Sequence, residues 1–144
     1  MLTESQISEI KEHLEKAQNP LFYYDNAADG LCSFLILRRF LGRGKGVAIR
    51  SFPDLNASYA KKAQELKADY VFILDKPVVS KEFVEEIEKL GLPLIWIDHH
   101  EIPNENPEDK FKNLFIYNPA KNQGKNKSDE PVTYLTYKIT NRKE

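Results

Sequence analysis

Short apolar runs alternate along this chain with stretches in which apolar residues recur every three or four positions. Five of the runs have the length and composition of buried strands. The predicted strands are Leu21–Tyr24, Val47–Phe52, Tyr70–Leu74, Pro93–Ile97 and Leu114–Tyr117. Several of them are apolar nearly throughout, which is typical of strands covered on both faces of a parallel sheet.

Helical patterns fill the segments before, between and after these runs. The predicted helices are Thr3–Ala17, Gly30–Leu41, Asn56–Lys67, Ser80–Leu90 and Pro131–Thr140. Thr3 and Gln6 have the spacing of a capping box at the first helix, and Gly91 stands where a C-terminal cap belongs. The alternation predicts an α/β fold with a mostly parallel five-stranded sheet flanked by helices. The polar segment Ala120–Glu130 is predicted to be a mobile loop.

Composition adds limits to this picture. With 144 residues, 30% of them charged and 41% hydrophobic, the chain has the size and balance of one soluble globular domain. A net charge of -1 gives no overall attraction to nucleic acid or membrane. The single cysteine, Cys32, excludes an intramolecular disulfide and is typical of a reducing compartment. No apolar run approaches ~20 residues, and the polar N-terminus does not resemble a secretory signal, so we expect a cytoplasmic protein without a membrane span.

Three polar clusters follow three of the predicted strands. Asp25-Asn26-Ala27-Ala28-Asp29-Gly30 follows the first strand, Asp75 follows the third, and Asp98-His99-His100 follows the fourth. The carboxyl ends of parallel strands meet at one edge of a sheet, so we expect these clusters to converge. Carboxylates and imidazoles favour Mn²⁺, Mg²⁺ or Zn²⁺. Two such cations would suit phosphoester hydrolysis, because they activate water and neutralise phosphoryl charge.

Each cluster also has a purely structural interpretation. Asp29 before Gly30 suits a helix cap, and Asp75 suits a turn. A lone histidine is more often a surface group, but His99 and His100 are adjacent and follow Asp98. Taken together, the clusters favour a site. The basic residues around positions 42–46 are interpreted as a solvated turn, with contact to nucleic-acid phosphates as the alternative.

These residues carry a family resemblance. Asp98-His99-His100 after an apolar strand resembles the signature of the DHH phosphoesterase superfamily. Asp25-x-x-x-Asp29-Gly30 with Ser33 resembles the first motif of its RecJ-like members. Asp75 stands at the place of the second motif, and Asn118-Pro119 matches an Asn-Pro that commonly follows the third. The order and spacing agree across nearly the whole chain.

The resemblance implies a role for each matching residue. The implied metal ligands are Asp25, Asp29, Asp75 and His99, with Asp75 bridging two divalent ions, commonly Mn²⁺ and alternatively Mg²⁺. His100 and Asp98 are the implied catalytic residues. His100 would contact the scissile phosphate or assist proton transfer, and Asp98 would ligate or orient its neighbours.

The chain departs from the pattern of this family in two ways. Ala27 stands where the first motif usually has a metal-binding aspartate, and alanine has no donor atom. Engineered inactivation and natural degeneration both remain open as explanations. The second departure concerns extent: we expect residues 1–144 to form one DHH domain that lacks the aspartate of the fourth motif and the C-terminal lobe of the DHHA1 type.

The expected function is that of a divalent-metal-dependent phosphoesterase, a nuclease-type hydrolase of phosphodiester bonds in single-stranded DNA or short oligonucleotides. An intact site would hold two Mn²⁺ or Mg²⁺ ions, and Ala27 puts turnover by this chain in doubt. The alternative is a catalytically degenerate scaffold that binds partners in a replication or repair complex. A third alternative is an unrelated metal-binding α/β protein with a chance match.

Overall fold

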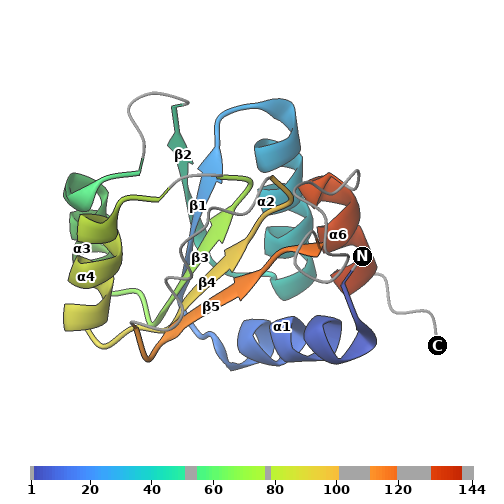
Figure 1. The fold of residues 1–144 in the computed structure, drawn as a ribbon, viewed down its shortest axis with the longest axis horizontal. Helices are drawn as coiled ribbons and strands as arrows, with labels where there is room; N and C mark the ends of the chain where they lie inside the picture. The colour runs from blue at the N-terminus through green and yellow to red at the C-terminus, as the bar shows by residue number, and fades with distance from the viewer. Residues whose placement is uncertain (1, 51–54, 77–78, 101–110, 120–130, 141–144) are drawn as a thin grey trace.

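Five parallel strands form one sheet at the centre of the molecule (Figure 1). The computed structural model describes residues 2–50, 55–76, 79–100, 111–119 and 131–140. The strands are β1 (Pro20–Asp25), β2 (Lys45–Ile49), β3 (Tyr70–Leu74), β4 (Leu94–Ile97) and β5 (Leu114–Tyr117). Their order across the sheet is β2-β1-β3-β4-β5, which confirms the predicted α/β class.

Helices cover both faces of the sheet, as Figure 1 shows. The helical elements are α1 (Glu4–Lys16), α2 (Ala28–Leu41), the 3₁₀ turn η1 (Ala57–Tyr59), α3 (Ala60–Glu65), α4 (Lys81–Lys89) and α6 (Val132–Thr140). Buried residues of α1, α2 and α6 share one core cluster with the sheet, and those of α3 and α4 share a second cluster. The sheet therefore lies between two helical layers.

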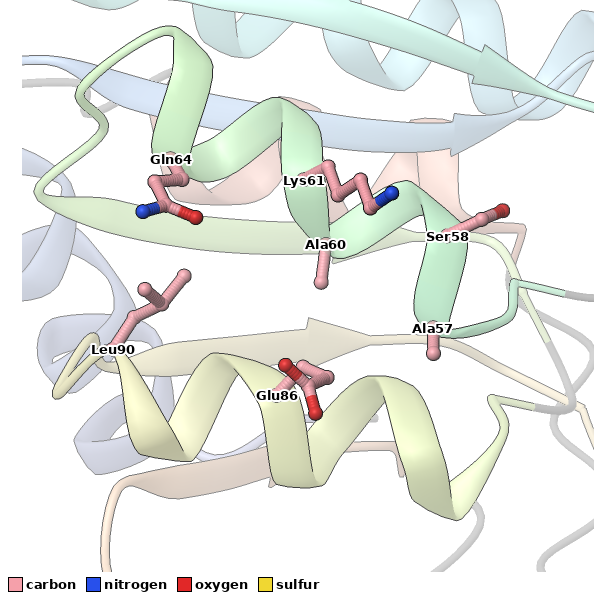
Figure 2. Close-up of a pocket in the computed structure, with 7 residues that line it drawn as sticks. All are labelled: Ala57, Ser58, Ala60, Lys61, Gln64, Glu86 and Leu90. Carbon is pink, nitrogen blue, oxygen red and sulfur yellow. The ribbon is translucent and has the colours of Figure 1, made fainter.

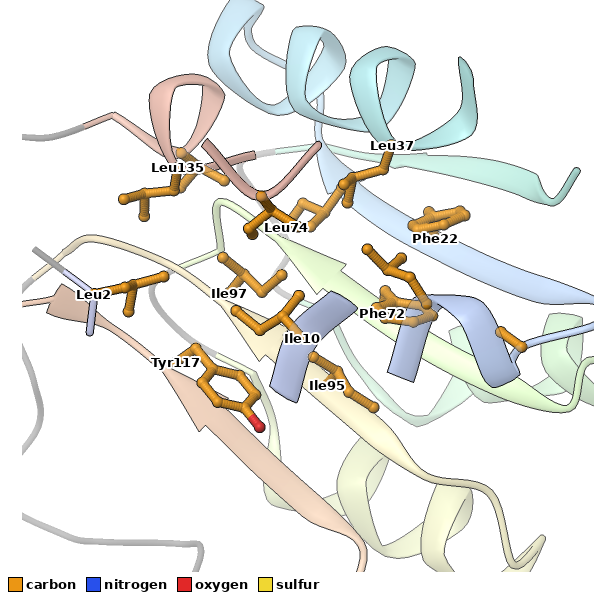
Figure 3. Packing of buried hydrophobic residues seen from close by; sticks show 14 residues of the cluster. Leu2, Ile10, Phe22, Leu37, Phe72, Leu74, Ile95, Ile97, Tyr117 and Leu135 are labelled. Carbon is orange, nitrogen blue, oxygen red and sulfur yellow. The ribbon is translucent and has the colours of Figure 1, made fainter. Parts of the chain in front are cut away.

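Alternate residues of each strand point into opposite cores, as the pleat requires. In β1, Phe22 belongs to the core under α1, α2 and α6, whereas Leu21 and Tyr23 belong to the core under α3 and α4. Figure 3 shows the first of these cores, where Phe22 and Phe72 stack at a centroid separation of 5.0 Å. Because both faces are buried, β3 and β4 are apolar at every position, whereas the edge strand β2 is mostly exposed.

Local sequence signals explain several element ends. The capping box at α1 is present, with Thr3 and Gln6 each bonding the other's backbone amide. Gly91 has a φ of 74° after α4, which confirms its predicted capping position. The predicted bounds of β2 were wrong: the strand begins two residues earlier, at Lys45, because Lys45 pairs with Leu21, and it ends at Ile49. The helix predicted over Asn56–Lys67 divides into η1 and the short α3, with Asn56 capping η1.

The strand order places a topological switch point between β1 and β3. From β1 the chain passes through α2 to β2, and it returns through α3 to β3 on the other side of β1. These two connections lie on opposite faces of the sheet. The chain therefore leaves the carboxyl ends of β1 and β3 toward opposite faces, and ligands of doubly wound sheets bind at such points. The predicted loop over residues 120–130 lies outside the described residues. Among the described helices, none combines the length and apolar character needed to cross a membrane.

Candidate metal centre

Asp75 and His99 come together at the carboxyl edge, from the ends of β3 and β4. His99 Nε2 lies 3.4 Å from Asp75 Oδ1. Asp75 directly follows β3 and has a φ of 65°, a left-handed conformation that aspartate tolerates better than most residues do. Its side chain is 7% exposed and that of His99 is 17% exposed. A carboxylate and an imidazole are thus held together with little access to water.

Two polar atoms of this pair are buried without a hydrogen-bond partner among the described residues. They are Asp75 Oδ1 and His99 Nδ1. Burial raises the pKa of the Asp75 carboxyl above its usual value, although the contact with His99 opposes the rise. The same contact raises the pKa of the His99 imidazole, against the effect of burial. Buried polar groups are normally satisfied, so this pair has unused capacity to bind a cation.

The second carboxylate–imidazole pair is Asp98 with His100. Asp98 Oδ1 lies 2.7 Å from His100 Nδ1, and Asp98 Oδ2 accepts the backbone N–H of His100. This hydrogen bond raises the pKa of His100. The side chain of His100 is 36% exposed whereas that of Asp98 is 5% exposed. Asp98 therefore fixes the ring of His100, and His100 is the more accessible imidazole of the two at this edge.

The donor atoms of these two pairs converge. One ligand atom from each of Asp75, Asp98, His99 and His100 lies within 4.8 Å of the others. Oxygen and nitrogen ligands lie roughly 2.0–2.2 Å from an ion such as Zn²⁺. Small side-chain movements would therefore allow the four ligand atoms to bind one divalent ion. Oxygen and imidazole nitrogen donors suit Mn²⁺. Together with the orphaned atoms of Asp75 and His99, this donor set fits a divalent ion.

Asp29 lies beside this cluster but already has partners from α6. Its carboxylate accepts the backbone N–H groups of Val132 at 2.9 Å and Thr133 at 2.7 Å, and the Thr133 hydroxyl also donates to it. His99 Nε2 is 3.8 Å from Asp29 Oδ2. Asp29 was alternatively interpreted as the cap of its own helix, but α2 begins at Ala28 and its N-cap Ala27 makes no side-chain bond. Asp29 caps α6 instead.

Asp25 faces a buried lysine. Lys76 Nζ lies 3.6 Å from Asp25 Oδ1, and the lysine side chain is only 2% exposed. The ammonium group also donates to the backbone carbonyl of Arg50 at 3.3 Å, and the Lys76 carbonyl accepts the indole N–H of Trp96 at 2.8 Å. Among the described residues, the four-donor cluster includes neither Asp25 nor Asp29.

Gly30 explains why the first cluster holds this shape. A Cβ atom at position 30 would lie 2.2 Å from the backbone oxygen of Asp25, a distance that no side chain can occupy. The start of α2 therefore packs directly against the end of β1, and Ser33 reinforces the turn by donating to the Asp29 carbonyl at 2.6 Å. Asp25 and Asp29 are brought to the same edge by backbone contact.

Other parts of the surface lie away from this edge. Figure 2 shows a groove of about 220 Å³ between η1, α3 and α4, lined by residues such as Lys61 and Glu86 and by none of the site residues. The basic segment at residues 42–46 joins α2 to β2, which begins at Lys45, and lies at the amino edge of the sheet. Arg43 Nε donates to the Ala17 carbonyl, and Arg38 Nε, from the last turn of α2, donates to the Gly44 carbonyl, so both arginines hold the fold together.

Sequence reasoning missed the contacts of three residues that organise the site. Lys76 partners Asp25, Thr133 partners Asp29, and Asn118 Nδ2 donates to the His100 carbonyl at 3.0 Å. The Asn118-Pro119 match pointed to the last of these without indicating its contact. A lysine directly after a buried strand was a weak signal for the first. Nothing local signals Thr133, which is 104 residues from Asp29.

Comparisons with known proteins agree with this architecture. The sequence model of the family described as DHH family, N-terminal domain, matches residues 21–141. No curated protein matches the chain.

Solved structures share the fold at low sequence identity. Exonuclease RecJ bound to manganese is 18% identical with a TM-score of 0.76, and the alignment covers 97% of this chain and 37% of that one. RecJ in complex with Mn²⁺ from Thermus thermophilus is 19% identical with a TM-score of 0.71, covering 97% and 21%. CDC45 from Entamoeba histolytica is 15% identical with a TM-score of 0.63, covering 97% and 30%. The chain thus spans well under half the length of each.

Proposed function

Because the chain belongs to the DHH family, we propose that it is a divalent-metal-dependent phosphoesterase domain that hydrolyses phosphodiester bonds in single-stranded DNA or short oligonucleotides. The observation that carries the proposal is the pairing of Asp75 with His99 at the carboxyl ends of β3 and β4, next to the switch point of the sheet, with a buried atom on each side chain that has no hydrogen-bond partner among the described residues. The RecJ structures with manganese make Mn²⁺ the first ion to test.

Asp75 and His99 are the proposed ligands of that ion. Asp98 and His100 complete the donor cluster, and Asp29, 3.8 Å from His99, is the next nearest carboxylate. When bound, a divalent ion would supply an activated water and neutralise phosphoryl charge. Asp75 fixes the position of the proposed ion, because its burial at the end of β3 leaves the carboxylate little freedom to move.

His100 is the proposed proton-transfer residue. Its ring is more exposed than that of His99, and its Nδ1 is engaged by Asp98, so its Nε2 is the nitrogen left for substrate. The Asp98 contact raises the pKa of His100, which keeps a proton on the ring at higher pH. That proton can pass to the leaving oxygen as the phosphoester bond breaks. The bond from Asn118 to the His100 carbonyl holds the backbone in place.

A second candidate function is that of a catalytically degenerate subunit that binds a replication or repair protein. Ala27 favours this candidate, because no donor atom stands at that position of the first motif. The fold shared with CDC45 is compatible with it. The two candidates differ in one respect that can be measured: only the phosphoesterase requires the Asp75–His99 pair to bind an ion.

The test is Mn²⁺-dependent cleavage of a 5′-labelled single-stranded oligonucleotide. The chain offers a matched control, since its third histidine, His13, lies on α1 and contacts Tyr70 and Phe115 instead of the site. We expect His99→Ala and His100→Ala to lose cleavage by about 100-fold or more, whereas His13→Ala retains it. Absence of cleavage by the wild type despite bound Mn²⁺, or equal cleavage by His99→Ala, would contradict the proposal and favour the subunit role.

A further inference from the structure

The ion pair between Lys76 and Asp25 involves a first-motif carboxylate that was expected to bind a metal ion. Two-metal phosphoesterase sites place their ions about 3.5–4 Å apart and share carboxylates between them. At this edge, Asp75 Oδ1 and His99 Nδ1 are buried without a hydrogen-bond partner among the described residues. The neighbouring carboxylate, Asp25, has an ammonium group 3.6 Å from its Oδ1.

Lys76 is built into this position. Its side chain is 2% exposed, although burial of an unpaired ammonium group is strongly unfavourable. The Arg50 carbonyl accepts a hydrogen bond from the ammonium group, and Trp96 holds the Lys76 carbonyl from β4. A solvated surface lysine has none of these restraints, so the cation is fixed beside Asp25.

The charges around Asp25 balance without a metal ion. Position 27 carries no carboxylate, because it is alanine, and Lys76 contributes one positive charge. One carboxylate with one ammonium is neutral, as two carboxylates with one divalent ion would be. The loss of a ligand at position 27 and the presence of Lys76 are therefore complementary.

We propose that this site binds a single divalent ion, at Asp75 and His99, and that the ammonium group of Lys76 takes the place of the second cation beside Asp25. The proposal rests on the proposed function, since it presumes the ion at Asp75 and His99. Lys76 acts by fixing positive charge next to the ion, and its burial keeps it out of direct contact with substrate. It is a positioning residue in this sense.

The experiment counts bound ions and needs no turnover. The metal-free chain of residues 1–144 is titrated with Mn²⁺, the bound ion is counted after equilibrium dialysis, and low-temperature electron paramagnetic resonance separates isolated from exchange-coupled Mn²⁺. The variants are Ala27→Asp, Lys76→Met and the double variant Ala27→Asp/Lys76→Met. Lys62→Met, on the exposed face of α3, is the matched control. Asp at position 27 suits the fold, because Ala27 is the N-cap of α2 and aspartate is favoured there.

The expected count is one uncoupled ion per chain in the wild type, Ala27→Asp and Lys62→Met, since Lys76 is present in all three. The double variant is expected to bind two ions with an exchange-coupled spectrum. If Lys76 had only a structural role, adding Lys76→Met to Ala27→Asp would not change the number of bound ions.

Two coupled ions in the wild type would overturn the proposal, as would a single ion in a correctly folded double variant. If the double variant fails to fold by circular dichroism, Ala27→Asp decides instead: a second ion there, with Lys76 still in place, would equally overturn it. Absence of any ion from every chain would contradict the proposed function itself, so the two failures are distinguishable.

Discussion

The two halves of the carboxyl edge contain the same residue types, but these residues have different roles. In the half built from β3 and β4, Asp75 and His99 keep buried atoms without partners among the described residues. In the half built from β1 and the start of α2, Asp25 faces Lys76 and Asp29 accepts the first amides of α6. We call the first half the open half, because its unsatisfied atoms can bind a ligand. We call the second half the closed half, because donors of the protein itself satisfy its carboxylates.

We propose that the contacts around a carboxylate, and not only its place in a family motif, decide whether it binds an ion. Asp75 Oδ1 has no hydrogen-bond partner among the described residues, although His99 Nε2 lies 3.4 Å away, whereas Asp29 stabilises the fold through two backbone N–H groups. We therefore expect substitutions in the two halves to act on different properties: on stability in the closed half and on ion binding in the open half.

The largest expected contrast in stability is between Asp25→Asn and Asp75→Asn. Asp25→Asn leaves the buried ammonium of Lys76 without its charge partner, so we expect the free energy of unfolding to fall by about 3 kcal/mol. Asp75→Asn removes a carboxylate whose pKa is raised by burial, so the metal-free protein is expected to be equally or more stable. Urea denaturation in the presence of a chelator measures both.

A double variant checks the cause of this contrast. Asp25→Asn/Lys76→Met removes both charges, and we expect it to recover at least half of the stability that Asp25→Asn loses. If the double variant is no more stable than Asp25→Asn, the ion pair is not what the substitution disrupts. A marked destabilisation by Asp75→Asn would show that the open half also holds the fold together.

The next effect concerns Asp29 as the cap of α6. Asp29→Ala removes the acceptor for Val132 and Thr133, and loss of a capping side chain costs about 1–2 kcal/mol. Thr133→Val keeps both backbone bonds and removes only the hydroxyl, so it is expected to cost less. Hydrogen exchange of the α6 amides identifies where the loss occurs. Equal protection of α6 in Asp29→Ala and wild type would contradict the capping role.

The smallest expected effect concerns how the stability of the metal-free protein depends on pH. The dependence has opposite signs for His99, inside the site, and for His13, outside it. The folded-state pKa of His99 is raised above 6.5 by Asp75, so its contribution to metal-free stability is complete below pH 6.5 and is lost as the pH rises through the raised pKa. Burial lowers the pKa of His13, so its contribution is present above pH 6.5 and is lost as the pH falls through the lowered pKa.

Thermal unfolding of metal-free protein across this range measures the two signs. We expect His99→Gln to flatten the decline of Tm on the alkaline side, and His13→Gln to flatten the decline on the acid side, each by a few degrees. A decline on the alkaline side that His99→Gln leaves unchanged would show that the contact with Asp75 is not its source.

Much of the fold could be predicted because its determinants are local. Apolar runs such as Tyr70–Leu74 mark strands buried on both faces, and Thr3 with Gln6 marks the start of a helix. β2 was predicted too late because its edge position depends on pairing with β1, a contact that Lys45 and Gly46 do not signal. The bounds of α3 depended on how Asn56 caps a 3₁₀ turn.

Of the candidate site, the convergence of three strand ends could be predicted, but the partners of each side chain could not. Asp29 and Asp25 were both expected to be ligands. Asp29 contacts Thr133, which is distant in sequence, and Asp25 contacts Lys76, which lies 51 residues after it in the sequence. Lys76 is bonded to Arg50, which follows β2, and to Trp96 of β4. Such contacts follow only from the tertiary fold.

The most direct test of the difference between the two halves is calorimetric titration of Mn²⁺ into metal-free wild type, Asp75→Asn and Asp25→Asn. Circular dichroism confirms that each variant is folded at the temperature of the titration. We expect the wild type to bind, Asp75→Asn to lose about 100-fold or more in affinity, since even residues that only orient ligands cost 10–100-fold, and Asp25→Asn to stay within about threefold of the wild type. Equal loss of affinity in both variants, or no binding by the wild type, would contradict an ion site confined to Asp75 and His99.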